Sequence, residues 1–237
     1  APLVEYIQQR GGTVLLNHPL DSIEVDDTGA VTAFKIRGIT DPNTGQLQPT
    51  RLFKADKYVS CVPVHIFQKL VPSAWTQPDA PTASFFDNIR PLESVPVINI
   101  HLWFDGKLDT PDADNLIFSK SKLLSVYADM SKTCKEYYDP DRSMLELVFA
   151  PAAARFGGAA VDEFGEYEDW IGRSDQEIVD ATMEELENLF PKHFGTDATD
   201  EVRLRKFRVV KTPLSVYWSR PGMQRHRPTQ RTPVHNF

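Results

Sequence analysis

The sequence predicts an α+β protein with a mostly antiparallel sheet. Its 237 residues are 41% apolar and 25% charged, which is typical of a folded domain with a real core. Short runs with apolar residues at every second position neighbour one another along the chain and are joined by turn-forming residues. The helical patterns lie between groups of such runs. The length corresponds to one large domain or two small ones.

The first seventy residues begin with a helix expected over 2–10. Leu3, Tyr6 and Ile7 fall at helical spacing, and Gly11 and Gly12 supply the stop. A short strand at 13–16 follows, and then two strands at 20–25 and 30–37 that an Asp-Asp-Thr-Gly turn joins. A second turn at 41–45 leads to strands at 51–54 and 57–61 and to a short helix at 64–70.

The strand at 97–104 has the clearest alternation in the chain. Ile98, Ile100 and Leu102 share one face, whereas His101 and Trp103 lie on the other. This pattern predicts a strand with one buried face and one mixed face. Further strands are expected at 123–128, 144–149 and 202–210.

The clearest helix begins after Ser174. Glu177 stands three residues later and completes a capping box, and Pro191 follows the end of the apolar stripe. The Gly-, Ala- and acid-rich segment 155–168 is expected to be a surface loop, and Asp139 before Pro140 is expected in a turn.

Several kinds of site are excluded by the residues themselves. Cys61 and Cys134 make no disulfide framework and no zinc pattern, and the six histidines show no metal-ligand spacing, so no metal is expected. Glycine-rich phosphate loops and the common hydrolase motifs are absent. Polar residues interrupt the most apolar window, 94–104, so no membrane-spanning helix is predicted.

Charge is unevenly distributed along the chain. Residues 201–237 contain nine Lys or Arg and one acid, a net charge of +8, whereas the whole chain carries −7. Such a basic segment suits either anionic lipid headgroups or the acidic remainder of the same protein. Nucleic acid is not expected as a partner, because the whole chain is acidic and has no recognised binding motif.

Long motifs in the middle of the chain resemble the plant-type phytoene desaturases of the flavin amine-oxidase-like superfamily. The matching runs are VINIHLWFD at 97–105, LLSVYADMS at 123–131, TCKEYY at 133–138, RSMLELVFAPA at 142–152 and VVKTP at 209–213. They are unusual and stand in the family's order, and the resemblance extends over nearly the whole chain.

The resemblance implies part of an FAD-binding, Rossmann-like fold with an inserted substrate domain that has a mixed or antiparallel sheet. The expected division is 1–72 for part of the FAD-binding domain, 73–210 for the substrate domain and 211–237 for the return to the FAD-binding domain. The chain would be the middle of a longer enzyme, because neither the family's N-terminal dinucleotide glycines nor its C-terminal flavin motif occurs in it.

The activity implied by the resemblance is desaturation of 15-cis-phytoene to ζ-carotene through phytofluene, with electrons passing from FAD to plastoquinone. The enzyme would act in plastids, as a peripheral, monotopic protein on the membrane. Its oligomeric state is left open, with a homo-oligomer as one option.

The resemblance also suggests site residues. Leu20, Val62 and Pro63 would approach FAD, Leu20 through its backbone. Candidates for the lining of the substrate or quinone channel come from the matched motifs, and each also fits ordinary core packing: Leu124, Tyr127, Met130, Phe149 and Tyr217. No residue stands out as the base that removes a proton.

Two alternatives remain open at this stage. One is a sister carotenoid oxidoreductase, a ζ-carotene desaturase or a carotene isomerase. The other is a non-enzymatic module that binds isoprenoids or lipids through the same apolar residues and the basic segment.

Overall fold

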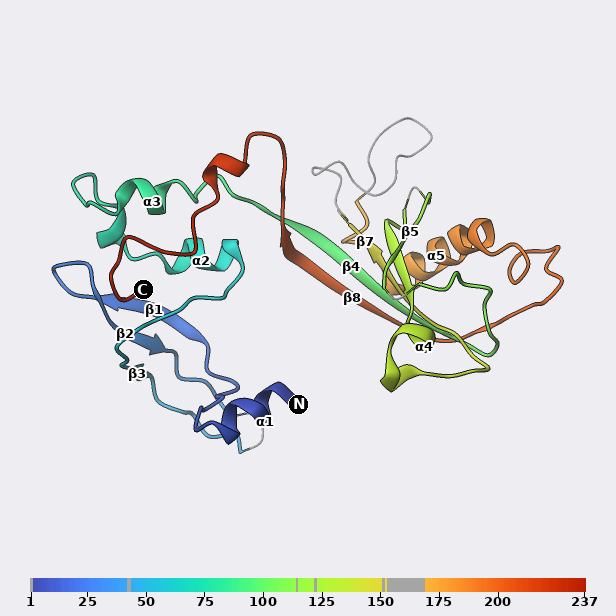
Figure 1. Ribbon diagram of the computed structural model, residues 1–237, viewed down its shortest axis with the longest axis horizontal. Coiled ribbons are helices and arrows are strands. Elements are labelled where there is room, and N and C mark those ends of the chain that lie inside the picture. Colours follow the sequence, from blue (N-terminus) through green and yellow to red (C-terminus); the bar gives the residue numbers. More distant parts are fainter. Residues whose placement is uncertain (1, 42–43, 114, 122, 151, 153–168) are drawn as a thin grey trace. The chain divides into compact units, whose positions relative to one another are not determined.

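The protein consists of two compact units, which a computed structural model describes for residues 2–41, 44–113, 115–121, 123–150, 152 and 169–237 (Figure 1). The first unit combines residues up to 92 with residues from 219 to the end, and the second unit comprises residues 93–218. The segment 155–168, expected to be a loop, lies outside the described residues.

The first unit contains a three-stranded antiparallel sheet in the order β1-β2-β3. Its elements are α1 (Pro2–Gln9), β1 (Leu20–Val25), β2 (Val31–Ile36), β3 (Arg51–Phe53), α2 (Val64–Leu70), η1 (Ser73–Thr76), α3 (Ala83–Asp87) and η4 (Gln224–His226).

Local sequence signals set the ends of α1 and of the first hairpin, as predicted. Gly11 has φ +80°, and the Gly12 N–H donates to the Ile7 carbonyl at 3.0 Å, which terminates α1. In the hairpin turn, Gly29 has φ +82° and the Asp26 carboxylate accepts from the N–H groups of Thr28 and Ala30. The end of α1 and the turn between β1 and β2 therefore both depend on residues that tolerate or stabilise a left-handed backbone.

The core of the first unit forms around the fully buried Trp75. Its ring stacks on Phe86 with the centroids 4.4 Å apart, and its Nε1 donates to the Gly29 carbonyl at 2.8 Å. The end of the chain joins this unit through Asn236, whose side chain donates to the Val31 carbonyl at 2.8 Å and accepts from the Val31 N–H at 3.0 Å.

Two expected strands of the first unit are wrong. Residues 13–16 and 57–61 belong to no strand, although their apolar content suggested one. A strand needs a partner with free backbone groups. Within the described residues neither segment joins a ladder, and the Tyr58 N–H donates to the Asn236 carbonyl instead.

The second unit contains a five-stranded antiparallel sheet in the order β5-β6-β7-β4-β8. Its elements are β4 (Ser94–Phe104), β5 (Ile117–Phe118), β6 (Val126–Asp129), α4 (Met130–Thr133), η2 (Lys135–Tyr137), β7 (Met144–Phe149), α5 (Asp175–Leu189) and β8 (Leu204–Tyr217). The prediction of antiparallel sheets is confirmed in both units.

The alternation predicted for β4 is confirmed. Ile98, Ile100 and Leu102 are fully buried, and they belong to one apolar cluster with Ile178 and Leu186 of α5. The capping box of α5 forms as expected, with the Ser174 hydroxyl accepting from the Glu177 N–H. One face of the sheet therefore carries the core of this unit.

The other face of the same sheet is mixed in character. In the register of the sheet, His101 lies opposite Arg208 and Glu146, and Trp103 lies opposite Lys206 and Met144. Strand β8 continues to Tyr217, seven residues beyond its expected end, because β4 offers pairing partners along its whole length. No described helix is long and apolar enough to cross a bilayer.

Candidate functional site

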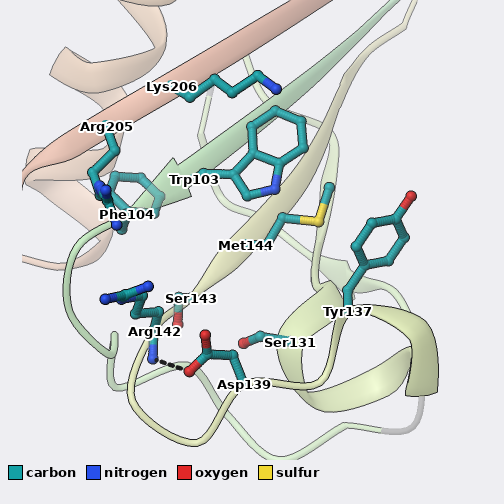
Figure 2. Close-up of a pocket in the computed structure, with 10 residues that line it drawn as sticks. All are labelled: Trp103, Phe104, Ser131, Tyr137, Asp139, Arg142, Ser143, Met144, Arg205 and Lys206. Carbon is teal, nitrogen blue, oxygen red and sulfur yellow. Dashed lines mark hydrogen bonds between the residues drawn. The ribbon is translucent and has the colours of Figure 1, made fainter.

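The second unit holds a cavity of about 480 Å³ where β4 ends and β7 begins (Figure 2). Its volume falls within the usual range for small-molecule sites. Ten residues line it: Trp103, Phe104, Ser131, Tyr137, Asp139, Arg142, Ser143, Met144, Arg205 and Lys206. Charged and aromatic side chains thus share one concave surface.

A β-bulge delivers two adjacent cations to this cavity. Trp103 pairs with Lys206 whereas Phe104 pairs with Leu204, so Arg205 is an extra residue on β8. Bulges redirect side chains that strict alternation would send to opposite faces. Arg205 and Lys206 consequently line the same cavity, and the Lys206 ammonium lies 5.1 Å from the centroid of the Trp103 ring.

The floor of the cavity depends on a buried carboxylate. Asp129 is 2% exposed and caps α4, with Oδ1 accepting from the Ser131 N–H at 3.1 Å and from its hydroxyl at 2.5 Å. Oδ2 accepts from the hydroxyls of Thr110 at 2.7 Å and Ser143 at 3.0 Å. Both carboxylate oxygens are therefore satisfied, as a buried charge requires.

Lys107 ties the loops around the cavity together. Its ammonium donates to the Ser131 hydroxyl at 2.8 Å, to the Asp139 carbonyl at 2.7 Å and to the Arg142 carbonyl at 3.2 Å. The hydroxyls of Ser131 and Ser143 are thus engaged within the protein, and they shape the floor without being free for a ligand.

Asp139 has the turn role that the sequence suggested. Its Oδ1 accepts from the N–H groups of Asp141 at 2.9 Å and Arg142 at 3.0 Å, the second of which Figure 2 draws as a dashed line. This Asx-type turn presents the Arg142 side chain to the cavity.

The cavity carries an excess of positive charge. Three cations line it, Arg142, Arg205 and Lys206, against the single acid Asp139. Within the part of the chain that the structure describes, no acidic side chain forms an ion pair with any of the three. The arrangement therefore suits an anion that also has an apolar or aromatic body.

The expected channel residues fall into two groups. Leu124, Tyr127 and Phe149 belong to the core of the second unit, where burial, with a smaller contribution from the Asp129 carboxylate, raises the pKa of the Tyr127 phenol. Met130 in α4 and Tyr217 at the end of β8 are only partly buried. The structure thus brings the first three together, and a channel role for all five stays a prediction.

The expected cofactor residues all lie in the first unit. Leu20 begins β1 and packs against the core, whereas Val62 and Pro63 are exposed just before α2. The backbone N–H groups of residues 59–62 form no hydrogen bond among the described residues. Free N–H donors beside exposed apolar side chains fit a flavin nucleotide, which offers phosphate oxygens and flat rings. Contact with FAD stays a prediction.

Sequence reasoning did not identify the cationic cavity. The alternation of Arg and apolar residues on β8 was visible, but the bulge at Arg205 depends on pairing with a strand about a hundred positions away. The described residues contain no group of three or more His, Cys, Asp or Glu that could hold a metal ion.

Comparison with known sequences agrees with the motifs. The chain is 51% identical over 236 residues to 15-cis-phytoene desaturase of Synechococcus elongatus and 44% identical to the chloroplastic/chromoplastic enzyme of Capsicum annuum. Both alignments cover 100% of this chain, but only 44% and 35% of those relatives. Identity to a probable zeta-carotene desaturase of Synechococcus elongatus is 29% over 251 residues, covering 100% of this chain and 46% of that relative.

Comparison with solved structures concerns the fold alone. An oxidoreductase from Methanosarcina mazei matches with a TM-score of 0.53 at 11% identity, covering 89% of this chain and 40% of that one.

The sequence profile of the flavin containing amine oxidoreductases matches residues 1–237. The identities of 44–51% over the whole chain confirm the resemblance to phytoene desaturases inferred from the motifs. The profile match over the whole chain shows that this chain belongs to the flavin-containing amine oxidoreductase family.

Proposed function

We propose that the chain is the middle part of an FAD-dependent 15-cis-phytoene desaturase, which forms ζ-carotene through phytofluene and passes electrons to plastoquinone. The observation that carries the proposal is 51% identity to 15-cis-phytoene desaturase of Synechococcus elongatus across this whole chain. The chain spans less than half the length of the relatives it matches, so the activity belongs to the complete polypeptide.

Desaturation removes a hydride from one allylic carbon and a proton from its neighbour, which leaves a double bond. FAD, when bound, accepts the hydride. The protein must orient the polyene and exclude water, because water would intercept the developing allylic cation. Phytoene has no polar group, so only shape and apolar contact can hold it.

We assign the shielding of the polyene to residues of the second unit. Met130 and Tyr217 retain some exposed surface and would contact the polyene directly. Leu124, Tyr127 and Phe149 are buried and would support the wall of the channel from behind. In the first unit, the exposed backbone around Val62 and Pro63 and the start of β1 at Leu20 would approach FAD.

This proposal makes the first unit part of an FAD-binding domain and the second unit a substrate domain. It also places the enzyme in plastids, on the surface of a membrane, with the basic residues near the end of the chain facing anionic lipid. The plant relatives named chloroplastic/chromoplastic support the compartment.

Two measurements on the complete polypeptide test the proposal. Purified protein is mixed with phytoene-containing liposomes and a plastoquinone analogue, and absorbance spectra and bound flavin are followed. We expect ζ-carotene bands that stop growing when the quinone is withheld. Bound flavin without conversion of phytoene would contradict the substrate, and absence of both would contradict the enzyme class.

A sister carotenoid oxidoreductase has less support than a phytoene desaturase. Identity to the probable zeta-carotene desaturase is 29%, against 44–51% for phytoene desaturases. Incubation with ζ-carotene in place of phytoene distinguishes the two, because further desaturation lengthens the chromophore and shifts its absorption to longer wavelength.

A further inference from the structure

We propose that the cavity beside Trp103 binds a phosphate group that carries an apolar or aromatic tail. The site is distinct from the residues assigned above to the polyene and to FAD, since none of those eight lines it. The proposal rests on three features of the second unit: the charge of the cavity, the character of its walls and the bulge that forms it.

The positive charge of the cavity favours an anionic ligand. Arg142, Arg205 and Lys206 line it and form no ion pair with an acid of the described chain. The one lining acid, Asp139, already accepts two backbone hydrogen bonds. Three cations concentrated on one concavity repel one another, and a bound anion would relieve that repulsion.

The number and type of the cations favour phosphate over a carboxylate. A phosphate monoester carries between one and two negative charges at neutral pH and offers three acceptor oxygens. Guanidinium groups donate paired hydrogen bonds to such oxygens, and an ammonium adds a further charge. A single carboxylate would be matched by one arginine and would leave the other cations uncompensated.

The apolar and aromatic side of the cavity favours a ligand whose phosphate carries a tail. Figure 2 shows Arg142 and Arg205 toward one side of the cavity, with Trp103, Met144 and Tyr137 toward the other. Tyr137 is 49% exposed, so part of its surface is available to a ligand. An aromatic or aliphatic group attached to the phosphate would cover these side chains and gain apolar burial.

The bulge indicates that the site is built into the fold. A regular β8 would send the side chains of two successive residues to opposite faces of the sheet. The extra residue at Arg205 breaks this alternation, and both cations line one cavity.

Phenyl phosphate titrated into the complete polypeptide by isothermal calorimetry, at constant ionic strength, tests the site. Inorganic phosphate is the comparison without a tail, and phenol is the comparison without a charge. We expect saturable binding of phenyl phosphate that is tighter than that of inorganic phosphate, and no detectable binding of phenol. Absence of saturable phenyl phosphate binding overturns the proposal.

Two matched pairs of variants separate a cavity from a diffuse basic surface. Arg205→Gln should weaken phenyl phosphate binding by about tenfold, the scale of one lost charge-assisted hydrogen bond. Arg208→Gln removes the same charge from the same strand outside the cavity and should leave binding unchanged. An equal loss in both variants would overturn the proposal, because the cations would then act only through their summed field.

The second pair tests the tail. Tyr137→Ser should reduce the preference for phenyl phosphate over inorganic phosphate, whereas Tyr138→Ser, at a neighbouring residue that is 68% exposed and outside the lining, should not. If both variants keep the full preference, the aromatic wall takes no part and the proposed ligand class is wrong.

Flotation with phosphatidylcholine vesicles, with and without phosphatidic acid, distinguishes the source of the phosphate. Flotation that needs phosphatidic acid, is lost in Arg205→Gln and is competed by phenyl phosphate assigns the site to a lipid headgroup. Binding of phenyl phosphate without such flotation assigns it to a free phosphate ester. Phytoene conversion is measured separately, so that failure of the proposed activity leaves this result intact.

Discussion

Replacing Asp129 by alanine should loosen the floor of the cavity. The carboxylate accepts four hydrogen bonds from three residues, Ser131, Thr110 and Ser143, and is 2% exposed. The three hydroxyl donors can turn toward other acceptors after the change, but the Ser131 N–H cannot. Since a hydrogen bond to a charged group contributes about 1.5–3 kcal/mol, we expect a loss of about 3–5 kcal/mol after this relaxation.

Amide hydrogen exchange in the complete polypeptide measures this loss locally. The N–H of Ser131 bonds Asp129 directly, and the N–H of Leu108 donates to the Ser143 hydroxyl. Both should exchange about two to three and a half orders of magnitude faster in Asp129→Ala, because each 1.4 kcal/mol corresponds to a factor of ten.

Two further variants control for the chemistry of the change. Asp129→Asn retains one oxygen acceptor and should cost only about 1–2 kcal/mol. Asp141→Ala removes an exposed carboxylate from the same region and should leave both amides unchanged. Acceleration of less than tenfold in Asp129→Ala would refute the view that this carboxylate organises the floor.

Three other predictions concern elements away from the cavity. The hydrogen bond from the Ser174 hydroxyl, followed by the one from its backbone N–H, lowers the pKa of Glu177. The stabilisation of α5 by this carboxylate is therefore present above the ordinary glutamate range and is lost as the pH falls through the lowered pKa. Amides in the first turn of α5 should exchange faster at pH 3 than at pH 6 relative to intrinsic rates, and Glu177→Gln should abolish the difference. Asn236→Ala leaves two backbone groups of β2 without partners and should destabilise the first unit by about 2–4 kcal/mol in denaturant unfolding, and an unchanged midpoint would contradict this. Gly29→Ala should lower the free energy of unfolding by about 1–2 kcal/mol because φ at this position is +82°. Gly172→Ala should be near neutral, because the new Cβ would meet open space and the backbone is not left-handed. Equal effects of the two substitutions would show that backbone conformation is not the cause.

The best sequence predictions were those in which neighbouring residues carry all the information. Alternating apolar residues in β4 predicted its buried face, because successive side chains of a strand point to opposite faces of the sheet. Ser174 and Glu177 predicted the start of α5, because a capping box is formed within four residues.

The wrong predictions involve partners distant in sequence. Residues 13–16 and 57–61 have the composition of strands, but a ladder requires free backbone groups of a second segment, which composition does not specify. For the same reason β8 was expected to end at 210, although β4 provides partners as far as Tyr217.

The sequence by itself determined the class of the fold, the family and the strongest local elements of this protein. Those properties are written in periodicity, capping residues and long motifs, all of which are short-range. Only the tertiary structure decided that Arg205 and Lys206 share a cavity with Arg142, and that the carboxylate of Asp129 is buried beneath it. Both depend on the register between β4 and β8 and on loops that meet after folding, and a register is set by the sum of many contacts between segments about a hundred residues apart.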